Sequence, residues 1–178
     1  GTPAFLVVPN GWHRLDARIF AERYTSAKVL CPSGSRKRVE KVVRVEGTYA
    51  DFPKSSVATL VELEGVKRRE GYVRVESKDG VSLVFNDVIF NLPHLPGVFG
   101  FIYRHLGSTG GLRVTRIVRL FLVSDRQVLA NELAALALDP RLARIIVMHG
   151  ETIAEEAGAR LAGVARSLDG EAKNADRT

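Results

Sequence analysis

Short apolar runs separated by polar turns form the first part of the chain. Residues 4–8 are a continuous apolar run bounded by proline, which is typical of a strand buried on both faces. Residues 16–24 place apolar side chains on one helical stripe, and residues 28–31 form a second short apolar run. A strand, a helix and a strand in so few residues predict a βαβ unit with parallel strands and a right-handed crossover. A short basic helix is expected next, over residues 35–43.

The middle of the chain changes to patterns of strand length. Residues 57–63, 72–77 and 81–88 alternate between apolar and polar positions or run apolar. Asp79-Gly80 lies between the last two segments in the manner of a hairpin turn. The pattern therefore predicts an antiparallel segment beside the parallel one.

The last part of the chain begins with a stretch that lacks a regular period. Residues 89–112 contain two prolines and five glycines, and we expect them to form a long irregular excursion. Periodic apolar positions resume after it and indicate elements that flank a sheet. The expected elements are helices over residues 113–123, 124–139 and 153–168, and a buried strand over residues 144–148.

The length and composition favour one globular domain. The chain has 178 residues, 46% of them hydrophobic, and no apolar run approaches the ~20 residues that cross a bilayer, so we expect no membrane association. The domain is expected over residues 1–168, followed by a polar, disordered tail over residues 169–178. Because the chain opens without Met and enters a strand at once, we expect the domain to be N-terminally incomplete.

Charge and cysteine content add two expectations. The net charge of +6 attracts phosphate-rich partners in a general way, and basic runs occur at residues 36–38 and 67–69. A non-catalytic basic module that binds nucleic acid or another polyanion is therefore one hypothesis, although such runs are usually solvated faces. The single cysteine, Cys31, cannot form an internal disulfide and favours a cytoplasmic setting.

Three of the expected strands end on polar residues that can carry chemistry. The strand ends read "PNGWHRLD", "FND" and "VMHGE", and they supply His13, Asp87 and His149. Ligands bind beyond strand ends in sheet-based folds, and two histidines with a carboxylate are a recognised metal-ligand set. Each residue also has a structural interpretation, His13 as a loop histidine and the other two as residues that bond backbone amides in turns. Sequence spacing leaves both interpretations open, because the three residues are far apart in the chain.

The order of these elements resembles the metallo-β-lactamase fold. In that superfamily a first motif HxHxDH follows a strand, a later strand supplies a lone histidine, and an Asp and a last histidine end two further strands. Asp87 in "VFNDVIF" and His149 in "VMHGE" match the last two positions. The resemblance covers residues 3–168 and implies an α/β (α+β layered) αββα sandwich that lacks the family's opening strands. A sheet shortened in this way can be completed by a second copy, so a homo-oligomer is left open.

The first motif departs from the family pattern. "NGWHRLD" offers Asn10, Trp12 and Arg14 when it is aligned without a slip, and His13 with Asp16 when it is shifted by one or two residues. The stretch "EGVKRREGY", where the family places its lone histidine, contains none. The resemblance therefore implies one zinc or other divalent metal ion at most, or none.

The candidate metal ligands are His13, Asp87 and His149, with Asp16 as a fourth ligand, an orienting residue or the cap of the following helix. A catalytic zinc typically needs three protein ligands, and a dinuclear hydrolase needs two metals. We therefore expect a degenerate metallo-hydrolase-like protein with weak or no hydrolytic activity on an unidentified small-molecule substrate. We also expect His13 to lie within a few ångströms of Asp87 and His149, and Trp12 to point inward. GxSxG, Walker and GxGxxG motifs do not occur in the sequence.

Overall fold

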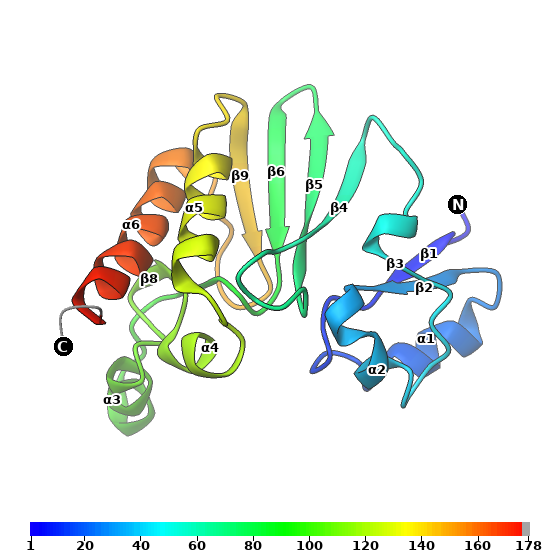
Figure 1. The fold of residues 1–178 in the computed structure, drawn as a ribbon, viewed down its shortest axis with the longest axis horizontal. Coiled ribbons are helices and arrows are strands. Elements are labelled where there is room, and N and C mark those ends of the chain that lie inside the picture. Colours follow the sequence, from blue (N-terminus) through cyan, green and yellow to red (C-terminus); the bar gives the residue numbers. More distant parts are fainter. Residues whose placement is uncertain (176–178) are drawn as a thin grey trace.

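A three-stranded parallel sheet begins the chain in the computed structural model, which describes residues 1–175 (Figure 1). Strands β1 (Phe5–Val7), β2 (Lys28–Cys31) and β3 (Gly47–Thr48) are neighbours in that order, and both pairings are parallel. Helix α1 (Ala17–Arg23) connects β1 to β2. The predicted βαβ unit with parallel strands is therefore confirmed.

The predicted basic helix is shorter than expected. A 3₁₀ turn, η1 (Ser33–Ser35), leads into α2 (Arg36–Val39), and a second 3₁₀ turn, η2 (Tyr49–Asp51), follows β3. The residues after α2 are rich in β-branched valine, which disfavours helix. Val43 and Val45 are instead buried against α1 and β2, so the chain leaves the helix to bring them there.

A four-stranded mixed sheet forms the second layer of strands. Its order is β4 (Ala58–Glu62), β5 (Gly71–Ser77), β6 (Gly80–Phe85) and β9 (Leu142–Val147). The pairs β4–β5 and β5–β6 are antiparallel, which confirms the predicted antiparallel segment, whereas β9 runs parallel to β6. Gly80 has a φ of +117° at the predicted hairpin turn, a conformation open to glycine.

The stretch expected to be irregular contains regular structure. Strands β7 (Phe90–Leu92) and β8 (Gly111–Arg113) pair antiparallel, and helix α3 (Gly97–His105) lies between them in the chain. Pro96 precedes the first residue of α3, where a missing amide costs no hydrogen bond, so the prolines and glycines bound the helix instead of preventing it. The expectation of a structureless excursion is therefore wrong.

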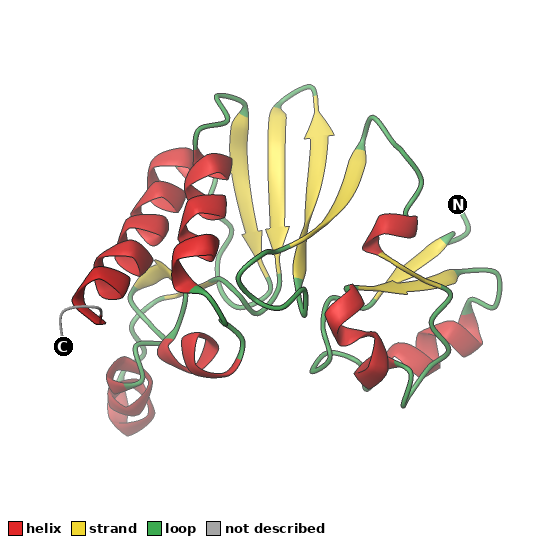
Figure 2. Ribbon diagram, in the orientation of Figure 1, coloured by secondary structure: helices red, strands yellow, loops and turns green. Residues whose placement is uncertain are grey.

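Helices α5 (Arg126–Ala137) and α6 (Ala157–Ala175) lie side by side over the outer face of the four-stranded sheet (Figure 2), and α4 (Arg116–Phe121) precedes them. Asp125 caps α5, because its carboxylate accepts from the Val128 amide (3.0 Å). The final helix was expected to end at residue 168, but it continues to Ala175, so most of the expected disordered tail is helical. Residues 176–178 of that tail lie outside the described residues.

Among the residues whose burial is described, the buried side chains form three clusters that define four layers. One cluster lies between α1, α2 and the parallel sheet, a second lies between the two sheets, and a third fills the space under α4, α5 and α6. The order helix, sheet, sheet, helix confirms the expected αββα sandwich. Among the described residues, no helix has both the length and the apolar character needed to cross a bilayer.

Candidate metal centre

Three loops that follow strands converge at one edge of the sandwich. His13 lies between β1 and α1, while Asp87 and His149 each lie two residues beyond the ends of β6 and β9. Because Phe85 pairs with Val147 at the ends of these parallel strands, Asp87 and His149 leave the sheet side by side. β1 belongs to the other sheet, so the cluster joins the ends of both sheets.

The three side chains meet at a single carboxylate oxygen. Asp87 Oδ1 lies 3.0 Å from His13 Nε2 and 2.9 Å from His149 Nε2. The three atoms that could bind a metal ion all lie within 4.8 Å of one another. The prediction that His13 would lie near Asp87 and His149 is therefore confirmed as geometry.

The cluster has a buried base and an accessible rim. The Asp87 side chain is 8% exposed, whereas the side chains of His13 and His149 are 39% and 35% exposed. Phe90 stacks on the His149 ring, with the centroids 4.5 Å apart and the planes 12° apart, and this contact holds the imidazole in place. A small ligand can therefore approach the imidazoles from solvent while the carboxylate stays fixed.

Asn10 holds the base of the cluster in place. Its amide nitrogen donates to Asp87 Oδ2 (2.7 Å) and to Glu70 Oε2 (2.8 Å). Its carbonyl oxygen accepts from the backbone amides of Trp12 (2.8 Å) and His13 (3.0 Å). Asn10 is 1% exposed, and all four of its hydrogen-bonding positions are satisfied. One amide thus orients both the Asp87 carboxylate and the backbone that carries His13.

Glu70 is a member of the site that sequence analysis missed. It is fully buried and accepts from Asn10 and from the Val88 amide (2.7 Å). Burial raises the pKa of its carboxyl to about 8, against the opposing effect of these donors. Its neighbours in "KRREGY" are basic, so the stretch looks like a solvated turn. The one signal was position, because Glu70 lies in the stretch where the family pattern places a histidine.

Two expectations about the first motif are wrong. Asp16 does not join the cluster, because its side chain is exposed at the residue before α1. It makes no capping hydrogen bond either, because backbone hydrogen bonds alone hold the first turn of α1. Trp12 is 41% exposed and does not fill the core of the site. Asn10 occupies the core of the site instead, and this smaller side chain finds a hydrogen-bond partner for each of its donors and acceptors.

The donor set of the cluster fits a single divalent metal ion. Two imidazole nitrogens and one carboxylate oxygen are three protein ligands of the kind that zinc and other transition metals take in catalytic sites. The other two histidines lie elsewhere, His94 against Thr109 Oγ1 (3.1 Å) and His105 against the Phe101 ring. Within the described residues, the convergent set therefore has three members.

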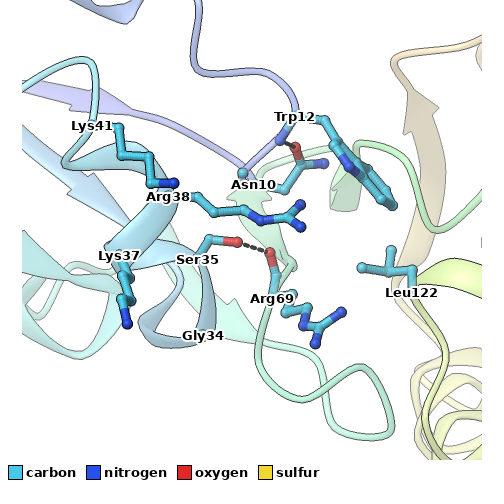
Figure 3. Close-up of a pocket in the computed structure, with 10 residues that line it drawn as sticks. Asn10, Trp12, Gly34, Ser35, Lys37, Arg38, Lys41, Arg69 and Leu122 are labelled. Carbon is cyan, nitrogen blue, oxygen red and sulfur yellow. Dashed lines mark hydrogen bonds between the residues drawn. The ribbon is translucent and has the colours of Figure 1, made fainter.

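A basic cavity lies beside the cluster (Figure 3). It has a volume of about 320 Å³ and lies between α2, the loop after β1 and the loop between β4 and β5. The two basic runs seen in the sequence meet here, because Gly34 of η1 contacts the backbone of Arg68. Four cationic side chains line the cavity together with Asn10 and Trp12: Lys37, Arg38, Lys41 and Arg69.

The chain resembles solved metallo-β-lactamases in structure. The enzyme from Pontibacter korlensis has a TM-score of 0.57 at 9% identity, with 91% of this chain and 68% of that chain covered. DIM-1 exposed to ceftazidime gives 0.56 at 14%, with 92% and 68% covered, and mono-zinc FIM-1 from Pseudomonas aeruginosa gives 0.53 at 14%, with 92% and 66% covered. No protein-family model matches the sequence, and no curated protein matches it. The chain therefore has the metallo-β-lactamase fold.

Proposed function

We propose that the protein is a degenerate metallo-hydrolase-like protein that binds one divalent metal ion and has weak or no hydrolytic activity. The observation that carries this proposal is the convergence of His13, Asp87 and His149 at the edge where the two sheets meet. The similarity to FIM-1, solved in a mono-zinc form, supports a one-metal centre on this fold.

In this proposal His13, Asp87 and His149 would hold the ion, each with one side-chain atom. When bound, such an ion supplies Lewis-acid chemistry, which activates water and polarises the bond to be cleaved. Asn10 keeps Asp87 Oδ2 engaged, so the other carboxylate oxygen stays directed at the two imidazoles. Phe90 restrains His149 and excludes water from one side of its ring. Each residue therefore binds or orients, and the accessible rim admits the substrate.

The weak activity follows from the residues around the cluster. The fold's hydrolytic pattern uses several histidines and a second carboxylate, whereas this chain places Asn10 and Glu70 against Asp87. Neither of these side chains is free to bind a second ion, since Asn10 is fully hydrogen-bonded and Glu70 is buried among donors. A centre that holds one metal ion lacks the second ion that would stabilise the attacking or the leaving oxygen.

The proposal predicts a low kcat/KM for hydrolysis. On p-nitrophenyl ester and phosphate substrates, the zinc-loaded protein should show a kcat/KM below about 10² M⁻¹s⁻¹, well under the ~10⁴–10⁸ M⁻¹s⁻¹ of typical enzymes. Any measurable rate should disappear in EDTA and in His149→Ala, while His105→Ala should keep it, because His105 lies on α3. A kcat/KM in the typical range, or a rate indifferent to His149→Ala, would contradict the proposal.

Nucleic-acid binding is the second candidate, and one observation favours it. The basic runs at residues 36–38 and 67–69 come together around η1. If a polyanion binds there, the affinity for a mixed-sequence oligonucleotide should fall steeply with salt, because several phosphates must exchange their counter-ions. Fluorescence anisotropy at 50 and 200 mM salt measures this slope. Absence of binding at the lower salt concentration removes the candidate.

A further inference from the structure

Two cavities flank the candidate metal centre and share a wall. The basic cavity lies on one side, and a second cavity of about 270 Å³ lies between β7, α3 and α4. Trp12 lines both cavities, Asn10 lines the basic one and Asp87 lines the other. Because Asn10 donates to Asp87 (2.7 Å), both cavities adjoin the same carboxylate. A ligand that spans them therefore passes Trp12 and lies near the Asp87 carboxylate.

The basic cavity is built to hold an anion. Figure 3 shows Arg38 extending from α2 towards the middle of the cavity, between Trp12 and Arg69. Among the side chains that the structure describes, none of the four cations that line this cavity pairs with a carboxylate, although Arg36 and Arg68 nearby do. A concave site lined by one sign of charge concentrates counter-ions, and guanidinium groups match phosphate and carboxylate oxygens in pairs.

Backbone contacts hold the two sources of positive charge together. Gly34 N donates to Arg68 O (2.8 Å), and Ser35 Oγ donates to Arg69 O (2.5 Å). A Cβ at position 34 would lie 2.2 Å from Lys67 O, so this approach requires glycine. Lys67 and Arg68 have φ values of 53° and 51°, a conformation that few non-glycine residues adopt. The relative placement of the cations is thus set by fixed backbone.

The second cavity is apolar. Phe90 and Leu92 of β7 line it together with Ile117 and Val118 of α4, and among the described residues Asp87 is the one charged member of its lining. Phe90 is the residue that stacks on His149, so the apolar wall is continuous with the centre. Small-molecule sites are mostly apolar with a few placed polar groups, and the two cavities together have this character.

We propose that the ligand of this centre is an amphiphilic anion. Its phosphate or carboxylate lies between Arg38 and Arg69, its apolar body lies against Phe90 and Val118, and the part that joins them lies at Trp12. This inference rests on the proposed function, because it names the substrate class of that site. Nucleic acid has no long apolar body to fill the second cavity, which separates this ligand from a polyanion.

The experiment uses Trp12 as its reporter, since it is the only tryptophan in the chain and lies between the cavities. The full chain is titrated in EDTA with octyl phosphate, octanoate, inorganic phosphate and octanol, and the emission of Trp12 is followed. We expect the tighter of octyl phosphate and octanoate to bind at least tenfold more tightly than either inorganic phosphate or octanol, because burying two methylene groups is worth about that factor. Whichever of the two binds more tightly identifies the head group.

Variants separate the two parts of the site. Arg38→Gln and Arg69→Gln should each weaken the better amphiphile at least tenfold, and Ile117→Gln should weaken it without changing inorganic phosphate binding. The matched control is Arg160→Gln, an exposed cation on α6. Because Arg38 and Arg69 lie on different elements, one variant alone can test the proposal if the other fails to fold.

The proposal is overturned if Trp12 does not respond to millimolar amphiphile, if inorganic phosphate or octanol binds as tightly, or if both arginine variants bind as the control does. Tighter binding of a mixed-sequence oligonucleotide than of both amphiphiles would also overturn it. EDTA is present throughout, so this result is independent of metal binding. Failure of the proposed function appears instead in the zinc stoichiometry and in the hydrolytic rates, neither of which this titration measures.

Discussion

At the scale of single residues, the site depends on one amide. Asn10 contacts the Asp87 and Glu70 carboxylates through its nitrogen and two backbone amides through its oxygen. Asn10, Asp87 and Glu70 are buried, so water cannot readily replace the amide as a partner of the two carboxylates. Asn10 therefore acts as a positioning residue for both His13 and Asp87.

Replacing Asn10 with alanine tests this role. Asn10→Ala should lower the free energy of unfolding by about 2–4 kcal/mol, because it leaves buried carboxylate oxygens and amides without partners. Urea unfolding followed by circular dichroism measures the change. The matched control, Asn131→Ala on the exposed side of α5, should change it by less than about 0.5 kcal/mol, since Asn131 accepts one hydrogen bond there. Equal effects of the two variants would refute the role given to Asn10.

The sequence predicted the three residues that converge at the sheet edge but not those that orient them. His13, Asp87 and His149 could be found because each follows an apolar strand, and strand ends meet at a sheet edge. Glu70 could not, because only the fold turns a carboxylate among basic neighbours into the buried partner of Asn10. Asp16 was included because a shifted alignment of the first motif matches it together with His13, but its side chain is exposed at the residue before α1.

At the scale of elements, α3 and α5 differ although both carry many apolar residues. Leu129 and Leu133 of α5 are fully buried under the sheet, whereas Phe99 and Phe101 of α3 are 76% and 58% exposed. Tyr103 of α3 lines the apolar cavity, whereas the large apolar side chains of this helix are exposed, so α3 contributes little to the core.

A matched pair of truncations tests this difference. Leu133→Ala should lower the free energy of unfolding by about 2–5 kcal/mol, because it leaves a cavity between α5 and the four-stranded sheet. Phe99→Ala should change it by less than about 0.5 kcal/mol, since most of its ring already contacts solvent. Thermal or urea unfolding of both variants provides the comparison. A large loss from Phe99→Ala would show that α3 is part of the core.

The elements were predicted where the apolar period was unbroken. The strands of both sheets other than β3, together with α5, were found close to their observed bounds, because their patterns extend over the whole element. Strand β3 was not predicted, since its two residues carry no detectable period. The β7–α3–β8 segment was not predicted either, since the prolines and glycines of residues 89–112 interrupt its apolar positions and leave no regular period to detect.

At the scale of the whole molecule, the candidate centre lies where the two sheets meet. His13 follows a strand of the parallel sheet, and Asp87 and His149 follow strands of the mixed sheet. An ion bound by all three would therefore link both layers of the sandwich. A ligand that binds only the folded state stabilises it. The midpoint of thermal unfolding should therefore rise as zinc occupies a larger fraction of the sites.

The zinc stoichiometry of the full chain, measured by isothermal titration calorimetry near pH 7.5, tests the central claim most directly. We predict one zinc ion per chain for the wild-type protein and for His105→Ala. In His149→Ala the loss of one of three ligands should remove measurable binding. Two ions per chain, no ion, or unchanged binding in His149→Ala would contradict the account.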